Sequence, residues 1–495
     1  MQLNVATILQ ESAVRHPDRT AVVDDGARIS YGTLWRDALR FAGRLRAHGI
    51  GPGDRVALLL PNTAAFPRAY YGALAAGATV VPVHALLVAD EVSYVLRHSR
   101  CRAVVTADAL APVAEAAAAD VGIDVLRADG EGAAALERAE PRRPDDTAVI
   151  LYTSGTTGRP KGALLTHANL VMNATICAQD LFALTPDDVV LGCLPLFHSF
   201  GQSCAMNAAL RAGSTLVLCS RFTGPGALEI LAAEGITVFM GVPTMYHALT
   251  TAAGDDGPVP GTLRLAVSGG AALPAAVLER FEETFGAVIL EGYGLTETSP
   301  AATFNQLSRG RSPGTVGHPI WGVETGIADP GAEDRIVLLD DGEIGEVVLR
   351  GHNIFAGYLD NPEATAAAVV DGWFRTGDLG VRDADGRLTI VDRKKDLIIR
   401  GGFNVYPREV EEILARHPCV AQVSVVGLPD EAKGEEICAA VVLRPGADEA
   451  PESIVAWARE RLGKHKYPRI VRLLTELPLG PSGKILKREL QKECA

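Results

Sequence analysis

The densest group of anion-binding side chains lies at residues 152–162, in the run Tyr-Thr-Ser-Gly-Thr-Thr-Gly-Arg-Pro-Lys-Gly. It follows residues 147–151, whose apolar character predicts a short buried strand. Glycines let several backbone N–H groups converge on one anion, while hydroxyl groups and a lysine add donors and charge. The run therefore predicts a polyphosphate site made by Thr153, Ser154, Gly155, Thr156, Thr157, Gly158 and Lys161.

The spacing of this run differs from that of a Walker loop. A Walker loop has four residues between its glycines and then Lys followed by Ser or Thr. Here two residues separate Gly155 from Gly158, Pro160 precedes the lysine, and Gly162 follows it. An ordinary flexible loop is the alternative, but the density of donors before Pro-Lys-Gly favours a ligand site.

The loop resembles the signature of the adenylate-forming superfamily, which includes acyl-CoA synthetases, adenylation domains of peptide synthetases and luciferases. That signature, [ST]-[SG]-G-[ST]-T-G-x-P-K-G, is matched through Gly162, and further motifs follow in the family's order to about residue 487. In motif detail the chain is most similar to bacterial fatty acyl-CoA synthetases. The resemblance implies that ATP and a carboxylic acid form acyl-AMP and pyrophosphate with Mg²⁺, and that CoA then takes the acyl group.

A second motif, Glu-Gly-Tyr-Gly-Leu-Thr-Glu, occupies residues 291–297. Its glycines would let the backbone pass close to a flat ligand, and Tyr293 can stack on a purine. The Glu297 carboxylate is a hard ligand for a Mg²⁺ ion that bridges phosphate oxygens. A glycine-rich turn with a structural tyrosine is the alternative. The resemblance assigns nucleotide contacts to Gly270, Ala271, Gly292, Tyr293, Gly294 and Thr296, and the metal to Glu297.

Two further motifs resemble those that complete the family's active site. Asp378, in Gly-Trp-Phe-Arg-Thr-Gly-Asp, matches the ribose-binding aspartate, because one carboxylate can accept bonds from both ribose hydroxyls. Arg393 resembles the second ribose contact. Lys484, in Pro-Ser-Gly-Lys, matches the catalytic lysine, whose ammonium offsets the repulsion between carboxylate and phosphate. The resemblance implies catalytic roles for Lys161, Thr296, Glu297 and Lys484.

The charged run at 392–396 predicts a solvated hinge between two domains, since such a segment can absorb a backbone rotation. By resemblance the hinge residue is Lys395. A glycine pair follows closely, and it would let the pantetheine arm of CoA reach the active site after the rotation. This channel is predicted at Gly401, Gly402 and Phe403.

Residues 194–201 resemble the family's acyl-binding motif. Where peptide-synthetase domains place an aspartate for the substrate ammonium, this chain has His198, which disfavours an amino acid. Residues 241–246 resemble another wall of the family's acyl pocket and contain no Arg or Lys to hold a second carboxylate, which disfavours a dicarboxylate. The mostly small or apolar lining favours a medium- or long-chain fatty acid over an aromatic acid. The predicted acyl contacts are His198, Ser199, Gln202, Ser203, Val242, Met245 and Gly269, with Met206 and Ala301 as further lining.

Composition limits the class of protein. The 495 residues exceed one hydrophobic core, and the net charge of −13 without a basic stripe excludes nucleic acid as an expected partner. Eight scattered cysteines without metal-ligand spacing indicate a reduced, cytoplasmic protein. The longest apolar stretch, near residues 70–89, is broken by glycine and proline, so no integral membrane segment is expected.

The periodic segments predict an α/β fold, because helical patterns alternate with short buried strands. Helix is expected at 31–48, strands at 55–60, 102–106, 214–218 and 236–240, and peripheral helix and loop at 107–140. A β subdomain is expected after residue 335. The predicted domains are 1–394, carrying the ATP and acyl sites, and 395–495, a small mobile α+β lid with helices and strands in the order α-β-β-α.

Two other functions remain open from the sequence. The adenylate could be transferred to an acyl carrier protein instead of CoA, or the chain could bind a nucleotide without turnover. Family members that load carrier proteins often have an insertion in the large domain, and no obvious extra segment is present here. The match to Glu297, Asp378 and Lys484 favours an enzyme over a nucleotide-binding protein.

Overall fold

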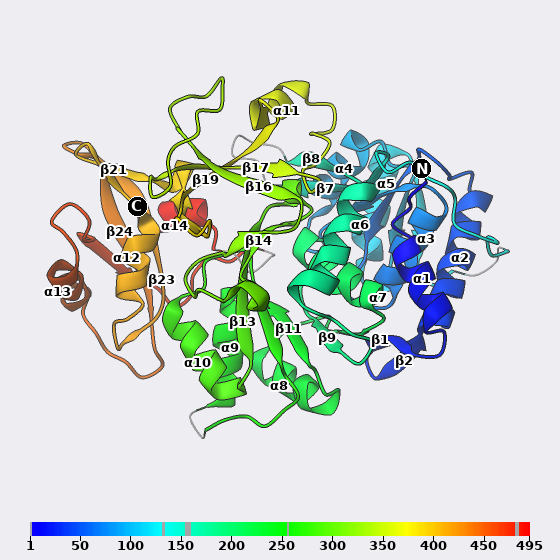
Figure 1. Ribbon diagram of the computed structural model, residues 1–495, viewed down its shortest axis with the longest axis horizontal. Helices are drawn as coiled ribbons and strands as arrows, with labels where there is room; N and C mark the ends of the chain where they lie inside the picture. Colours follow the sequence, from blue (N-terminus) through cyan, green and yellow to red (C-terminus); the bar gives the residue numbers. More distant parts are fainter. Residues whose placement is uncertain (1, 131–133, 154–159, 255–256, 481–484) are drawn as a thin grey trace.

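The computed structural model describes residues 2–130, 134–153, 160–254, 257–480 and 485–495. It is a mixed α/β fold with a large N-terminal part and a small C-terminal part, which lie at opposite sides of the view in Figure 1. Four sheets organise the described chain.

The first sheet has six strands in the order β6-β5-β3-β4-β7-β8, and all neighbouring pairs except β7–β8 are parallel. Alternate residues of its central strands enter cores on opposite faces, so that Leu58 and Leu59 lie in different clusters. The strands are β3 (Arg55–Leu59), β4 (Thr79–Pro82), β5 (Ala103–Thr106), β6 (Asp124–Arg127), β7 (Thr147–Thr153) and β8 (Lys161–Thr166). The helices connecting or following them are α3 (Ala65–Ala75), α4 (Ala89–His98), α5 (Ala111–Val121) and α6 (His167–Ile176).

The second sheet has nine strands in the order β15-β14-β13-β12-β11-β9-β10-β1-β2 and is parallel from β13 to β1. Its strands are β1 (Thr20–Asp24), β2 (Ala27–Ser30), β9 (Val189–Gly192), β10 (Thr215–Leu218), β11 (Val238–Gly241), β12 (Leu265–Ser268), β13 (Val288–Gly294), β14 (Ala301–Phe304) and β15 (His318–Pro319). Its helices are α1 (Thr7–Arg15), α2 (Tyr31–Ala47), α7 (Ala208–Ala212), α8 (Gly224–Ala233), α9 (Pro243–Ala253) and α10 (Ala275–Phe285). Residues Cys177–Leu181 and Phe200–Asn207 form π-helical turns.

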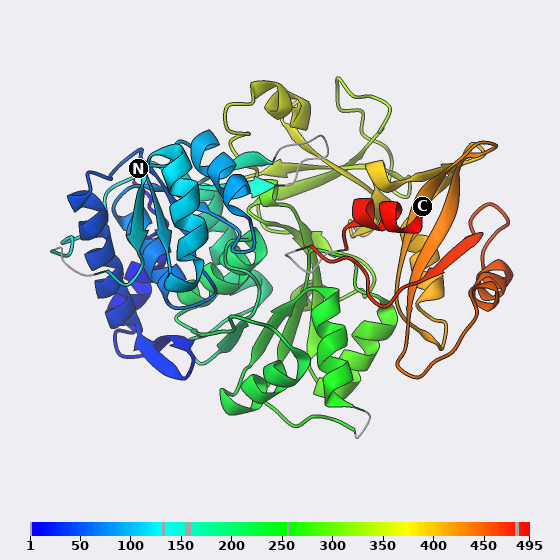
Figure 2. The same ribbon diagram turned by 180° about the vertical axis from the view of Figure 1, so that it is seen from behind.

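These two sheets share a core. Side chains of α2, α3 and α6 pack with the facing sides of both sheets in one continuous cluster. Helices α8, α9 and α10 cover the other face of the nine-stranded sheet, and α4 and α5 cover the other face of the six-stranded sheet. The result is five alternating layers of helix and sheet. Figure 2 shows helices α8 to α10, in green, in the lower part of the view and the first sheet at the left.

The third sheet is antiparallel and begins at Val323, earlier than the expected residue 335. It joins β16 to β17, β17 to β19, and β19 to both β18 and β20. Its elements are β16 (Val323–Ala328), β17 (Gly345–Gly351), α11 (Pro362–Ala368), β18 (Val369–Val370), β19 (Trp373–Arg382) and β20 (Leu388–Arg393).

The fourth sheet belongs to the C-terminal part. Helices α12 and α13 pack on one of its faces and α14 on the other. The elements are β21 (Ile398–Arg400), β22 (Phe403–Val405), α12 (Pro407–Leu414), β23 (Val420–Asp430), β24 (Gly434–Leu443), α13 (Pro451–Arg461), β25 (Ile470–Leu473) and α14 (Lys487–Cys494). The expected α-β-β-α order corresponds to α12, β23, β24 and α13. The predicted boundary at 394/395 falls in the 3-10 turn between β20 and β21, and it stays a prediction.

Most expected elements occur within two residues of their predicted bounds. The stretch 107–140 is different, because it contains an edge strand, β6, that sequence reasoning missed. Only Leu126 of that strand is buried, so there is no apolar run to predict it. Across the described ranges, no helix has both the length and the apolar character that spanning a bilayer requires.

Candidate nucleotide and acyl site

The predicted nucleotide residues lie at the carboxyl ends of parallel strands. Gly241, Ser268 and Glu291 are in register on β11, β12 and β13, so the residues after them emerge at one edge of the sheet. Ligands of open α/β sheets bind at this edge. Gly269 is buried there and Gly270, with φ +82°, turns the chain outward. Ala271 follows at the surface.

Gly292 and Gly294 are required by the protein's own packing. A Cβ atom at Gly292 would lie 2.2 Å from the ring of Phe304, and one at Gly294 would lie 1.8 Å from the carbonyl oxygen of Pro300. At this point β13 leaves the parallel sheet and pairs with antiparallel β14. The glycines therefore permit this change of partner, whether or not a ligand also approaches them.

Tyr293 and the two predicted ribose residues are in direct contact. The Tyr293 hydroxyl donates to Asp378 Oδ2 at 2.6 Å, and Arg393 Nε lies 3.1 Å from Asp378 Oδ1. Asp378 and Arg393 face each other in register on β19 and β20. Burial, and then the Asp378 carboxylate, raise the pKa of Tyr293, so its hydroxyl stays protonated and donates. The structure thus brings the predicted adenine and ribose groups together.

A buried ion pair supports the strand segment that carries Asp378. Arg375 Nη2 donates to Glu346 Oε2 at 2.7 Å, and both side chains are less than 10% exposed. The other oxygen, Glu346 Oε1, accepts from Gly377 N at 3.1 Å. Sequence analysis missed this pair, because Glu346 lies 29 positions before Arg375 and belongs to no motif.

The carboxylate predicted to bind the metal and the lysine predicted to bind phosphate both lie beside Tyr358. Glu297 is buried in a short 3-10 helix, Thr296–Thr298, and its Oε1 accepts a bond of 2.8 Å from the Tyr358 hydroxyl. Lys161 Nζ lies 5.1 Å from the centre of the Tyr358 ring. Thr153 and Lys161 are paired across β7 and β8, so the two ends of the predicted phosphate loop are held side by side.

Several predicted residues lie outside the described ranges, so the structure gives no position for them. They are Ser154, Gly155, Thr156, Thr157 and Gly158 of the phosphate loop, and Lys484.

The donor set fits a nucleotide with Mg²⁺. Glu297 offers a buried carboxylate whose Oε1 takes the Tyr358 bond, leaving Oε2 as a hard oxygen ligand. Among the described residues, no group of three or more His, Cys, Asp and Glu could hold a metal ion. Asp378 has the two oxygens that a ribose diol needs. Bound Mg²⁺ would neutralise the negative charge of the phosphates.

The predicted acyl residues gather around the π-helical turn at 200–207. Gln202 and Ser203 are fully buried, and Gln202 Nε2 donates to Leu196 O at 3.2 Å. Within the described chain, Gln202 Oε1 and Ser203 Oγ have no hydrogen-bond partner. A Cβ atom at Gly269 would lie 3.3 Å from the Phe200 ring, which connects this turn to the nucleotide edge.

The remaining acyl residues border the same region. Ser199 is buried, and His198 Nδ1 accepts from Phe200 N at 3.2 Å, which fixes the imidazole ring beside the turn. Val242 precedes α9 and is buried, while Met245 lies in its first turn. Met245 Cβ lies 3.3 Å from the position a Cβ would take at Gly241, at the carboxyl end of β11.

The predicted CoA channel is separate from these groups. Gly401 and Gly402 form the exposed turn between β21 and β22, with φ values of +57° and +82°. Phe403 is 59% exposed, and the centre of its ring lies 5.0 Å from the centre of the His465 ring. Figure 1 shows this edge of the C-terminal sheet on the side away from β7 and β8. The channel therefore needs a rearrangement and stays a prediction.

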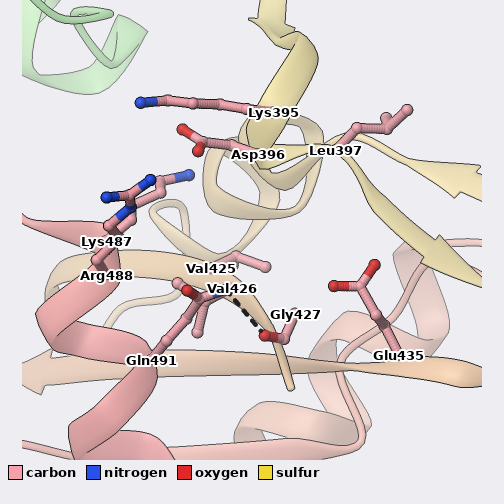
Figure 3. A pocket seen from close by; sticks show the side chains of 10 residues that line it. All are labelled: Lys395, Asp396, Leu397, Val425, Val426, Gly427, Glu435, Lys487, Arg488 and Gln491. Atoms are coloured by element: carbon pink, nitrogen blue, oxygen red, sulfur yellow. Dashed lines mark hydrogen bonds between the residues drawn. The ribbon is translucent and has the colours of Figure 1, made fainter. Parts of the chain in front are cut away.

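A cavity of about 150 Å³ lies beside the predicted hinge residue, Lys395. Figure 3 shows Lys395 and Asp396 on one side and Lys487, Arg488 and Gln491 of α14 on the other. Burial, and then the charge of Arg393, lower the pKa of Lys395. The predicted hinge residue therefore lies near several other cationic side chains.

The expectation of a wholly solvated hinge segment was wrong at its first residue. Asp392 is buried and accepts from the backbone N–H groups of Arg393 at 2.8 Å and Arg408 at 3.0 Å. Burial raises the pKa of this carboxyl. Asp392 therefore connects β20 to the start of α12. Nearby, Lys487 Nζ of α14 lies 3.0 Å from Glu411 Oε1 of α12.

Most of the chain matches two models of one enzyme family. Residues 9–359 match the family model described as AMP-binding enzyme, and residues 409–484 match the AMP-binding enzyme C-terminal domain. A long-chain-fatty-acid–CoA ligase of Bacillus subtilis is 34% identical, over 98% of this chain and 94% of that enzyme. A sulfoacetate–CoA ligase of Cupriavidus necator is 37% identical, over 98% of this chain and 97% of that enzyme. The ATP-bound structure of MatB from Rhodopseudomonas palustris is similar with a TM-score of 0.91 and 34% identity, over 99% of both chains.

Proposed function

This chain belongs to the family of AMP-binding enzymes and is an acid–thiol ligase. We propose that it converts a carboxylic acid, apolar and uncharged apart from its carboxylate, to the CoA thioester. In the first step the carboxylate attacks the α-phosphorus of ATP, which gives acyl-AMP and releases pyrophosphate. In the second step the thiol of CoA attacks the acyl carbon, which gives the thioester and releases AMP.

The contact of Tyr293 and Arg393 with Asp378 is the observation that carries the nucleotide part of this proposal. It leaves a buried, oriented carboxylate for the ribose hydroxyls. Thr296 would contact the α-phosphate, Lys161 the phosphate chain, and Glu297 the metal. Lys484 would offset the charge that develops when carboxylate and phosphate meet. Rotation about Lys395 would then move Lys484 out of the active site and bring the turn at residues 401–403 into it.

The surroundings of the acyl residues support an acid with no charged group besides its carboxylate. Phe200, Met206, Val242 and Ala301 are buried, and the polar groups among them, Gln202 and Ser203, carry no charge. A second anion would need a counter-charge, and the predicted lining contains no Arg or Lys. We therefore favour a medium- or long-chain fatty acid, in line with the name of the Bacillus relative. An aromatic acid is the alternative. The name of the Cupriavidus relative argues for testing a second anionic group as well.

The acid is tested by pyrophosphate exchange with acids from C4 to C18, aromatic acids and sulfoacetate. We expect the highest kcat/KM with a chain of medium or greater length. A preference for sulfoacetate or an aromatic acid would contradict the fatty-acid assignment, and no exchange with any acid would contradict the ligase itself.

The acceptor is tested with the preferred acid and two thiols, CoA and a carrier protein bearing phosphopantetheine. We expect acyl-CoA as the product. Acylated carrier protein without acyl-CoA would overturn the CoA assignment and leave the adenylation step intact.

A further inference from the structure

Tyr358 contacts both the carboxylate and the lysine assigned to the triphosphate. Its hydroxyl donates to Glu297 Oε1 at 2.8 Å, and its ring centre lies 5.1 Å from Lys161 Nζ. A neutral side chain thus lies between a negative group and a positive group.

The backbone around Tyr358 is attached to the same two segments. Leu359 N donates to Gly162 O at 2.8 Å and Leu164 N donates to Gly357 O at 2.9 Å, so residues 356–359 run antiparallel beside β8. Next to them, Phe355 N donates to Glu297 O at 2.9 Å. The position of Tyr358 relative to both charged residues is therefore set by main-chain bonds.

The absence of charge on the Tyr358 side chain matters because it lies between Glu297 and Lys161. An acidic side chain would pair with Lys161, and a basic one would pair with Glu297, so either would reduce the charge available to Mg·ATP. A tyrosine hydroxyl orients a carboxylate through a charge-assisted hydrogen bond. An aromatic face attracts an ammonium without neutralising it. Tyr358 can restrict the motion of both groups and leave both charges intact.

We propose that Tyr358 is a positioning residue for Mg·ATP: its hydroxyl holds Glu297 Oε1 and leaves Oε2 for the metal, and its ring fixes the Lys161 ammonium. The inference rests on the proposed function, because it concerns the same nucleotide site. It assigns no chemical step to Tyr358, which acts through Glu297 and Lys161.

The test measures binding of an ATP analogue whose α,β-oxygen is replaced by methylene, by calorimetry over a range of Mg²⁺ concentrations. We expect Tyr358→Phe to raise the half-saturating Mg²⁺ concentration about tenfold, since it removes a hydrogen bond to a charged group. The matched control is Tyr31→Phe, which removes a buried hydroxyl bond of 2.6 Å to Ser214 O in the core. This control should leave the Mg²⁺ dependence unchanged. The analogue releases no pyrophosphate, so the result is independent of which acid or thiol the enzyme uses.

A double substitution separates positioning from packing. In a Glu297→Gln background, Tyr358→Phe should change the Mg²⁺ dependence by less than about twofold, because the carboxylate that it orients is gone. Tyr358→Leu, which also removes the ring, should weaken analogue binding at saturating Mg²⁺ a further two- to fivefold. An unchanged Mg²⁺ dependence in Tyr358→Phe, or an equal effect in the Gln background, would overturn the proposal. A loss of folding much larger than that of Tyr31→Phe would also overturn it, since Tyr358 would then be structural.

Discussion

Replacing Asp378 by asparagine should selectively remove recognition of a ribose hydroxyl. The Asp378 side chain is 7% exposed and already accepts from Tyr293 at 2.6 Å and from Arg393 at 3.1 Å. Asparagine has nearly the same shape and can still accept from Tyr293, but it has lost the charge that pairs with Arg393. The substitution therefore changes the electrostatics of the site more than its packing.

The size of the effect follows from the kind of bond that is lost. A hydrogen bond to a charged group contributes about 1.5–3 kcal/mol, which corresponds to a change of about 10- to 100-fold in kcat/KM for ATP. Because Asp378 is shielded from water, solvent screening should reduce this value little. Acyl-AMP contains the same ribose, so both half-reactions should be impaired.

The assay compares ATP with 2′-deoxy-ATP and 3′-deoxy-ATP in pyrophosphate exchange. The wild-type enzyme should lose about 10- to 100-fold with at least one deoxy analogue. Asp378→Asn should lose less than about threefold more with that analogue, because the partner of the missing hydroxyl is already absent. Asp383→Asn is the control, since Asp383 lies in the exposed turn between β19 and β20 and bonds to backbone N–H groups there. Equal losses with the deoxy analogue in wild type and Asp378→Asn would refute the assignment of Asp378 to the ribose.

Three further predictions follow from the same site. Lys484→Ala should reduce acyl-AMP formation at least about 100-fold but leave conversion of supplied acyl-AMP to acyl-CoA within about threefold, and equal loss of both rates would contradict its role. Lys395→Pro should restrict the hinge backbone and slow the thioester step while adenylation persists, so an unaffected thioester rate would remove Lys395 as the hinge. Burial raises the pKa of Glu291, so the carboxyl stabilises the fold when protonated and this contribution is lost as pH rises through its folded pKa. Glu291→Gln keeps an acceptor for Gly314 N, so its melting temperature should exceed that of wild type by an amount that grows from pH 5 to pH 8. A constant difference over that range would contradict the prediction.

The elements that sequence analysis predicted correctly are those with a strong apolar signal. Strand β3 and helix α2 were expected almost at their observed bounds, because one is a continuous buried run and the other has a clear apolar face. Strands β6 and β25 were missed for the opposite reason. Each is short and has a single buried residue, so pairing with a neighbouring strand determines it instead of its own composition.

Motifs located residues of the candidate site but not the contacts between them. Tyr293 and Asp378 lie 85 positions apart, and Glu297 and Tyr358 lie 61 apart, so only the folded chain reveals their hydrogen bonds. Spacing also suggested that Gly292 and Gly294 serve the ligand, whereas Phe304 and Pro300 already exclude a side chain there. Asp392 looked like a solvated charge because its neighbours are charged, yet the fold buries it against the start of α12.

The most direct test of the reaction is the fate of a carboxylate oxygen. The preferred acid, labelled with ¹⁸O in both carboxylate oxygens, is converted to its thioester by the enzyme with ATP and CoA, and the AMP is analysed by mass spectrometry. Attack of the carboxylate on the α-phosphorus predicts one ¹⁸O atom in each AMP and one in each thioester. Unlabelled AMP, or ADP and labelled phosphate in its place, would contradict activation through an acyl-adenylate.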